Sequence, residues 1–111
     1  MATVDIYREY IQQLLTERSK LVWNPKIRAE TIFDPERDHY QLVYVGWPTN
    51  DRRVYGVVLH VDLIDGKIWI QQDGTEEGLA NKLVELGVPK QDIILGFNSP
   101  LIREYTDFGV E

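Results

Sequence analysis

Apolar side chains recur at intervals of three and four residues near the start of the chain, which is the spacing of one face of an α-helix. Thr3 is placed to act as the N-cap, and Asp5 lies in the first turn, where the helix dipole favours a negative charge. Asn24-Pro25 ends the pattern, because the residue before a proline is pushed out of helical geometry. The spacing predicts an amphipathic helix over about residues 4–19 whose apolar stripe is Val4, Tyr7, Ile11, Leu14 and Leu15.

Residues 27–73 change to a β-like pattern, rich in β-branched and aromatic residues. Turn-forming clusters divide it at residues 34–38, at residues 48–51 and at Asp65-Gly66, and Asp-Gly is a strong short signal for a hairpin. Four strands that follow one another as an antiparallel meander are the simplest interpretation. The predicted strands are Ile27–Phe33, Tyr40–Trp47, Arg53–Leu63 and Lys67–Gln72.

The Asp65-Gly66 pair also predicts how the last two strands are aligned. In a two-residue type I′ turn the residues on either side of the pair face each other, and each step outwards pairs the next two residues. Because side chains alternate between the two faces of a strand, polar residues of this hairpin share one face and apolar residues the other. The predicted polar pairs are Asp62 with Trp69 and His60 with Gln71; the predicted pairs of the apolar face are Leu63 with Ile68, Val61 with Ile70 and Leu59 with Gln72.

The residues after the fourth strand carry signals for a second helix. Residues 73–76, Asp-Gly-Thr-Glu, have the spacing of a capping box, and Gly87 is suited to a left-handed C-cap. A helix is therefore predicted over about residues 76–86, and one more turn and an extended segment are expected within Gln91–Phe97. The predicted fold class is α+β: a mainly antiparallel four-stranded meander with an N-terminal helix and a second helix after strand four.

Length and composition fit a single domain over residues 1–111, with 43% hydrophobic residues. The chain has no cysteine, which is typical of a reducing compartment. No apolar stretch approaches the roughly 20 residues needed to cross a bilayer. We expect a cytoplasmic protein that does not insert into a membrane.

The net charge of −6 is unevenly distributed along the chain. Residues 1–61 contain eight acidic and eight basic residues, whereas residues 62–111 contain ten acidic and four basic residues. Binding of nucleic acid draws much of its affinity from Lys and Arg that neutralise phosphates. Arg52 and Arg53 are interpreted as solvated residues of a turn, so DNA contact is expected to be indirect or weak. The aromatic residues of the predicted sheet are assigned to the core and to an interface: Tyr40, Tyr44, Trp47, Tyr55 and Trp69.

His60 and Asp62 lie on one side of a predicted strand and could serve as metal ligands. Catalytic zinc usually takes three protein ligands, however, and the other histidine, His39, precedes a different predicted strand. A hydrogen-bonded polar face or a subunit contact is the simpler interpretation.

Asp73, Glu76 and Glu77 could act as acid–base groups or hold magnesium. Their place at a predicted helix start explains them more simply, because carboxylates are stabilised by the dipole there. We therefore expect no catalytic residue, no cofactor and no metal. The candidate interaction surface comprises His60, Asp62, Trp69, Gln71, Asp73, Glu76 and Glu77.

Several segments taken together resemble one family. They are residues 66–82 (Gly-Lys-Ile-Trp-Ile-Gln-Gln-Asp-Gly-Thr-Glu-Glu-Gly-Leu-Ala-Asn-Lys), residues 38–47, residues 60–71, residues 87–97 and residues 105–108. The first segment resembles the core signature of the fdxN element excision controlling factor XisI and its relatives, small proteins found mostly in cyanobacteria. The others resemble that family's second strand, its central hairpin and its C-terminal portion, so the resemblance covers nearly the whole chain.

The resemblance implies a factor for excising a DNA element that interrupts a nitrogen-fixation operon during heterocyst differentiation. Such a factor acts with a separate recombinase and with a partner, XisH, whose family looks nuclease-like. It implies no catalytic residue. The leading hypothesis is a non-enzymatic regulator that binds an XisH-like protein through its acidic C-terminal half or through the face that carries His60 and Trp69.

Two other functions stay open at this stage. One is a DNA-binding recombination directionality factor, which the acidic pI of about 4.9 disfavours. The other is a metal-dependent hydrolase centred on His60 and Asp62. A homodimer formed through the polar face or an edge strand is a further hypothesis.

Overall fold

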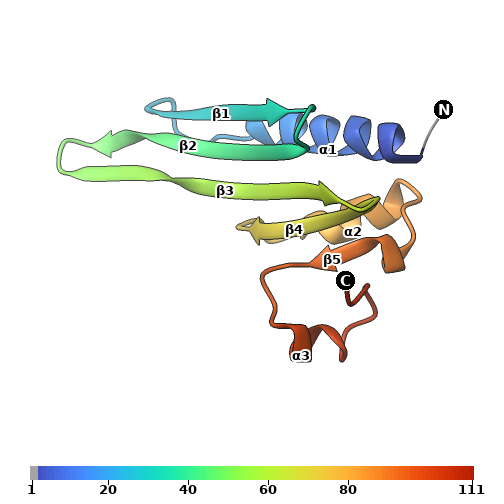
Figure 1. The fold of residues 1–111 in the computed structure, drawn as a ribbon. Coiled ribbons are helices and arrows are strands. Elements are labelled where there is room, and N and C mark those ends of the chain that lie inside the picture. Colours follow the sequence, from blue (N-terminus) through green and yellow to red (C-terminus); the bar gives the residue numbers. More distant parts are fainter. Residues whose placement is uncertain (1–2) are drawn as a thin grey trace.

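A five-stranded sheet forms the centre of the structure, and α1 and α2 lie together on one of its two faces (Figure 1). The computed structural model describes residues 3–111. The strand order is β1-β2-β3-β4-β5; the first four strands pair antiparallel with their neighbours, and β5 runs parallel to β4. The elements are α1 (Thr3–Ser19), β1 (Ile27–Asp34), β2 (His39–Thr49), β3 (Arg52–Ile64), β4 (Lys67–Asp73), α2 (Leu79–Glu85), a short 3-10 turn η1 (Lys90–Asp92), β5 (Ile93–Leu95) and α3 (Pro100–Arg103). The α+β class is confirmed.

The core lies between α1, α2 and one face of β2, β3 and β4. The helices contribute Tyr7, Ile11, Leu14 and Leu15 of the predicted stripe together with Leu79 and Leu83 of α2, whereas Val4 is half-buried and lies outside the core. The strands contribute every second residue, which is the alternation of a pleated sheet. Within residues 3–111, none of the helices is both long enough and apolar enough to cross a membrane. The fully enclosed side chains of this core include Ile11, Leu15, Tyr40, Leu42, Val61, Ile68, Ile70, Leu83 and Ile93.

The prediction of four strands is wrong in one respect, because Ile93–Leu95 form β5 beside β4. Three residues are too few to show a strand period, and a parallel neighbour needs a crossover, which here contains α2. The expected turn and extended segment within residues 91–97 are confirmed as η1 and β5. The left-handed cap is confirmed as well: Gly87 has φ +101°, and the N–H of Val88 bonds to the carbonyl of Leu83 at 3.1 Å.

The β3–β4 hairpin has the predicted turn. Asp65 and Gly66 have φ +52° and +78°, as a type I′ turn requires. The first four predicted pairs are observed: Ile64 with Lys67, Leu63 with Ile68, Asp62 with Trp69, and Val61 with Ile70. Beyond them the predicted register is wrong, because a β-bulge leaves Gln71 without an opposite residue and pairs His60 with Gln72 and Leu59 with Asp73.

Helix α2 begins at Leu79, three residues later than predicted. The Oδ1 atom of Asp73 accepts hydrogen bonds from the backbone N–H of Thr75 at 2.9 Å and from its hydroxyl at 2.5 Å. The other carboxylate oxygen accepts from the N–H of Leu79 at 2.7 Å. Asp73 thus fixes a loop over residues 74–78 and caps the helix from six residues away, so the predicted capping box with Glu76 is wrong.

The paired ends of β2 and β3 project beyond β4 and the helices, and we call residues 44–58 the arm (Figure 1). At its base the backbone of β1 crosses very close to Gly46. A Cβ atom at residue 46 would lie 2.2 Å from the carbonyl oxygen of Lys26 and 2.8 Å from the Cα of Ile27. Glycine is therefore required there, and the close approach places Lys26 against the arm.

Arg8 ties α1 to the turn between β1 and β2. Its guanidinium donates to both oxygens of Asp38, at 2.7 Å from Nε and 3.0 Å from Nη2, and the Tyr40 hydroxyl donates to the same carboxylate at 3.0 Å. The bond from Arg8 lowers the pKa of Asp38, and the bond from Tyr40 acts in the same direction. Burial, reinforced by the bond to Asp38, raises the pKa of Tyr40 to about 12.

Replacing Gly46 by alanine should destabilise the fold by about 1–3 kcal/mol, the usual range for overpacking, because the new methyl group meets rigid backbone. Gly56→Ala, in the same arm, is the matched control, since a Cβ there has no atom within 4 Å. Urea unfolding of the two variants measures the difference. Equal stability of the two would contradict the close approach of the backbone at Gly46.

Replacing Arg8 by methionine should make stability less dependent on pH in the acid range. The folded pKa of Asp38 lies below its ordinary value of 3.8, so its contribution to stability is present above about pH 4 and is lost as the pH falls through the folded pKa. The parent protein should exceed Arg8→Met in its free energy of unfolding at pH 7, and the gap should close in acid.

The control for this experiment is Arg37→Met. Arg37 is 81% exposed and lies 3.7 Å from Asp34, a surface pair worth about 0–1 kcal/mol. Urea unfolding at a series of pH values tests both variants. The same pH dependence for both would argue against a special role for the Arg8–Asp38 pair.

Candidate interaction site

The face of the sheet opposite the helices, here called the open face, carries a polar cluster built around Asp62. One carboxylate oxygen, Oδ1, lies 2.8 Å from Nδ1 of His39 and 3.0 Å from Nε2 of His60, and Oδ2 accepts a hydrogen bond from the Gln71 amide at 3.2 Å. Asp62 is only 8% exposed although it carries an acidic side chain. Since a carboxylate only accepts hydrogen bonds, each histidine donates, which the neutral ring can do in the appropriate tautomer. We call these four residues the Asp62 cluster.

Strand pairing explains why these residues meet. His39 pairs with Asp62 across β2 and β3, and Asp62 pairs with Trp69 across β3 and β4. The bulge at Gln71 changes its predicted partner but leaves its amide directed at Asp62. The expected grouping of His60, Asp62, Trp69 and Gln71 on one face is therefore observed.

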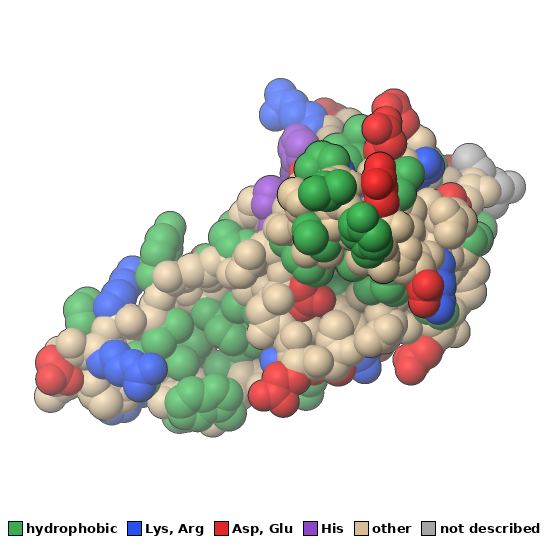
Figure 2. Space-filling model, turned by 90° about the horizontal axis from the view of Figure 1, so that it is seen from below, with side chains coloured by type: hydrophobic (Ala, Val, Ile, Leu, Met, Phe, Trp, Pro, Cys, Tyr) green, Lys and Arg blue, Asp and Glu red, His purple; other side chains and the backbone are tan. Residues whose placement is uncertain are grey.

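His39 is the member of the cluster that was not among the predicted surface residues. It is the first residue of β2 and pairs with Asp62, because the two shifts in the β2–β3 register cancel. Counting outwards from a four-residue turn at residues 48–51 would instead place it opposite His60, whereas β2 and β3 extend to Thr49 and Arg52 and leave a turn of only two residues. The two histidines lie near each other at the surface in Figure 2, at the root of the projecting arm. One signal in the sequence could have indicated the direction of His39. Polar and apolar residues alternate from His39 to Leu42, so His39 and Gln41 point away from the core that Tyr40 and Leu42 enter.

Trp69 borders the cluster and is half-buried. The Arg103 guanidinium lies over its indole ring at 4.9 Å from the centroid, a cation–π distance. Arg103 belongs to α3, so the C-terminal segment reaches β4 at Trp69, and further along it Gly109 forms a bridge with Ile94 of β5. The Asp62 cluster thus has a rigid aromatic wall on one side.

The acidic part of the predicted surface lies elsewhere. Asp73 is occupied by the loop before α2, and Glu77 pairs with Arg18 of α1 at 2.9 Å, on the helix-covered side. Glu76 is exposed in the same loop. The structure therefore separates Asp73, Glu76 and Glu77 from the Asp62 cluster.

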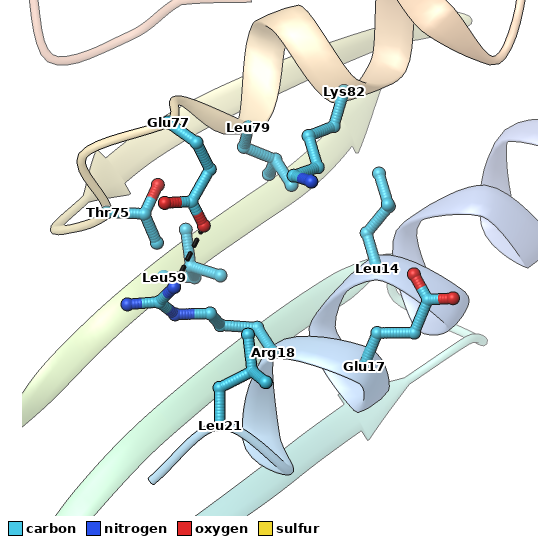
Figure 3. Close-up of a pocket in the computed structure, with 9 residues that line it drawn as sticks. All are labelled: Leu14, Glu17, Arg18, Leu21, Leu59, Thr75, Glu77, Leu79 and Lys82. Carbon is cyan, nitrogen blue, oxygen red and sulfur yellow. Dashed lines mark hydrogen bonds and ion pairs between the residues drawn. The ribbon is translucent and has the colours of Figure 1, made fainter. Parts of the chain in front are cut away.

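A small hollow lies between the end of α1 and the loop before α2 (Figure 3). Its volume of about 70 Å³ is well below the roughly 300 Å³ at which pockets for small molecules begin. The Arg18 side chain crosses it to reach Glu77, while the buried Nε of Arg18 has no hydrogen-bond partner among the described residues. Four leucines line its apolar part, namely Leu14, Leu21, Leu59 and Leu79. We interpret the hollow as the seam between the two helices.

The chemistry of the Asp62 cluster is that of a satisfied hydrogen-bond network. Nδ1 of His39 and Nε2 of His60 are both directed at the same carboxylate oxygen, Oδ1 of Asp62, within hydrogen-bond distance. Over residues 3–111, no group of three or more His, Cys, Asp or Glu side chains is arranged to hold a metal ion. The arrangement suits a rigid polar contact surface.

The fold and this face define a small α+β protein with one helix-covered side and one open side that carries a fixed polar patch. The chain belongs to the XisI family, since the family model described as XisI protein matches residues 1–110. No curated protein matches the sequence.

Two crystal structures of proteins from Anabaena variabilis ATCC 29413 are similar to this chain along nearly its whole length. A XisI-like protein is 42% identical, with a TM-score of 0.90, over 97% of this chain and 99% of that one. The fdxN element excision controlling factor XisI is 31% identical, with a TM-score of 0.85, over 99% of this chain and 100% of that one.

Asp62→Ala should lower the free energy of unfolding by about 1–3 kcal/mol, because it leaves the donors of His60 and Gln71 without their acceptor in a largely buried place. Asp62→Asn keeps one acceptor oxygen and should cost less. His39→Ala should also cost less, because the His39 side chain is 57% exposed and water can replace its bond. Urea unfolding of the three variants measures these differences. An unchanged free energy of unfolding in Asp62→Ala would contradict a stabilising role for the Asp62 cluster.

Proposed function

We propose that this chain is a non-enzymatic regulatory factor for excision of a DNA element and that it acts by binding a protein partner of the XisH-like nuclease family. One of the similar crystal structures is that of a protein named as an excision controlling factor, and control of a reaction is a regulatory role. The family match over residues 1–110 supports carrying that role over to this chain. The partner and its binding surface are our proposals.

The observation that carries the proposal is the Asp62 cluster beside Trp69 on the open face. Protein interfaces concentrate binding energy in aromatic residues and arginines surrounded by ordered polar groups, and Trp69 with Arg103 above it has that composition. The Asp62 carboxylate is already fixed by three side chains. A partner that meets it orders few additional groups, which lowers the entropic cost of binding.

The open face supports this role better than the acidic loop before α2. Asp73 and Glu77 already have internal hydrogen-bond or ion-pair partners, so removing them from those partners would weaken the fold. Among the described residues, Glu76 is the only acidic residue of that loop whose carboxylate has no hydrogen-bond or ion-pair partner. A second way to use the acidic loop would be to imitate DNA phosphates and occupy the DNA-binding cleft of the nuclease, but that would need a larger acidic surface.

Trp69→Ala should weaken binding of the XisH-like protein by about 2 kcal/mol, the threshold of an interface hot spot. Co-purification of the two chains at low salt, followed by titration calorimetry, measures the effect. Leu21→Ala is the control, because Leu21 is an exposed apolar residue beside the seam of the helices, away from the open face.

The double variant Glu76→Lys/Glu77→Lys tests the acidic loop in the same assay. Our proposal expects a small change in affinity, mainly through a slower encounter. If this variant lost binding while Trp69→Ala bound fully, the interface would lie at the acidic loop and not at the open face. If the two chains formed no complex at low salt, the proposal of an XisH-like partner would be wrong.

A further inference from the structure

The arm differs in charge from the rest of the protein. Residues 20–30, which lead into and form the start of β1, together with the arm contain five basic and two acidic residues, whereas the remaining chain contains seven basic and sixteen acidic residues. Figure 2 shows basic and hydrophobic side chains together at the projecting end. An acidic protein thus carries a local positive surface at one end.

Most cations of this surface lack acidic partners. Among residues 3–111, no carboxylate lies within 4.0 Å of the side-chain nitrogens of Lys26, Arg52 or Arg53, whereas Arg8 and Arg18 of α1 are both paired. Arg28 has a partner in Glu30 at 3.0 Å, but its side chain is highly exposed. The positive charge at the arm is therefore available to a ligand.

Aromatic rings are placed among these cations. The Arg53 guanidinium lies over the rings of Trp47 and Tyr55, at 5.4 and 5.6 Å from their centroids. Trp47 is 49% exposed and Tyr55 is 73% exposed, so much of each ring is open to solvent. Stacking holds the guanidinium in place while its N–H groups remain free to donate.

Strand register places Arg28 and Tyr55 on the open face. Arg28 pairs with Val45, and Val45 pairs with Tyr55, so the three side chains form one row across β1, β2 and β3. Val45 also lines a shallow hollow of about 360 Å³ together with Lys26, Trp47 and Arg53. The close approach at Gly46 fixes the backbone of Lys26 beside this hollow.

We propose that the arm is a binding site for single-stranded nucleic acid. The site consists of Trp47, Arg53 and Tyr55 of the arm together with Lys26 and Arg28 beside it, and we call these five residues the arm patch. Exposed rings give bases a surface for stacking, and unpaired arginines and lysines between them contact the phosphates. An acidic peptide would use the cations but not the exposed parts of the two rings, and a duplex would not offer the faces of its bases. The proposal goes beyond the protein partner proposed above and does not depend on it.

Fluorescence anisotropy with a labelled oligothymidylate of about 12 nucleotides, within the usual range of single-strand sites, tests the site at low salt. Trp47→Ala and Tyr55→Ala should each weaken binding about tenfold, whereas Tyr55→Phe should retain it, because the ring remains. Arg53→Ala should weaken binding and lower the slope of log K against log salt by about 0.7 for each phosphate that the protein no longer neutralises.

Arg37→Ala is the matched control, because it removes the same charge from an exposed side chain in the turn between β1 and β2, outside the arm. Its affinity should stay close to that of the parent protein. If Arg37→Ala lowered the affinity as much as Arg53→Ala, the effect of Arg53 would be explained by net charge alone, and the proposed binding site would be wrong. Melting temperatures of all variants confirm that each is folded.

Competition separates the other ligand classes. Duplex DNA of equal length that binds as tightly as the single strand would overturn the stacking proposal, and a polyglutamate peptide that displaces the oligonucleotide at equal charge would assign the arm to an acidic protein. Trp69 belongs to the proposed protein interface and lies outside the arm patch, so Trp69→Ala should bind the oligonucleotide with the affinity of the parent protein. The result for the protein partner and the result for the nucleic acid can therefore be judged separately.

Discussion

Burial of a single face of the sheet is the interaction on which the rest of this structure depends. Side chains of α1 and α2 share one core with every second residue of the central strands, and each enclosed aliphatic side chain contributes about 1.5–3 kcal/mol. Because strand side chains alternate, the core also determines what points the other way. Asp62 stands between the buried residues Val61 and Leu63, so packing of those two residues obliges its carboxylate to lie on the open face.

A carboxylate in that position has to be satisfied by the protein itself. Asp62 is too enclosed to rely on water, and burying a charged group without hydrogen bonds is costly. Donors from β2, β3 and β4 meet that need, one from each of the three neighbouring strands. The same bonds that stabilise Asp62 also hold His39, His60 and Gln71 in one arrangement, so the demands of folding produce a preorganised surface patch.

Local patterns in the sequence predicted the parts of the fold that depend on local chemistry. The Asp65-Gly66 turn predicted four residue pairs correctly, and Gly87 marked the end of α2. Local patterns failed where contacts between distant residues determine the geometry. An alternating sequence gives no sign of the bulge at Gln71. The spacing from Asp73 to Glu76 predicted a capping box, whereas Asp73 instead caps the helix at Leu79. His39 was missed because the turn between β2 and β3 has only two residues, shorter than the turn cluster at residues 48–51 suggested, and this turn length sets its partner as Asp62.

The open face contains two regions of different character, separated along β3. Tyr55 of the arm patch and Asp62 are seven residues apart on one strand, which corresponds to roughly 20 Å at the rise of an extended chain. That distance exceeds the screening length of about 8 Å at physiological salt, so charge brought to the arm barely changes the potential at Asp62. The two proposed ligands, a polyanion at the arm and a protein beside Trp69, would therefore not oppose each other through charge, although they share one face of the sheet.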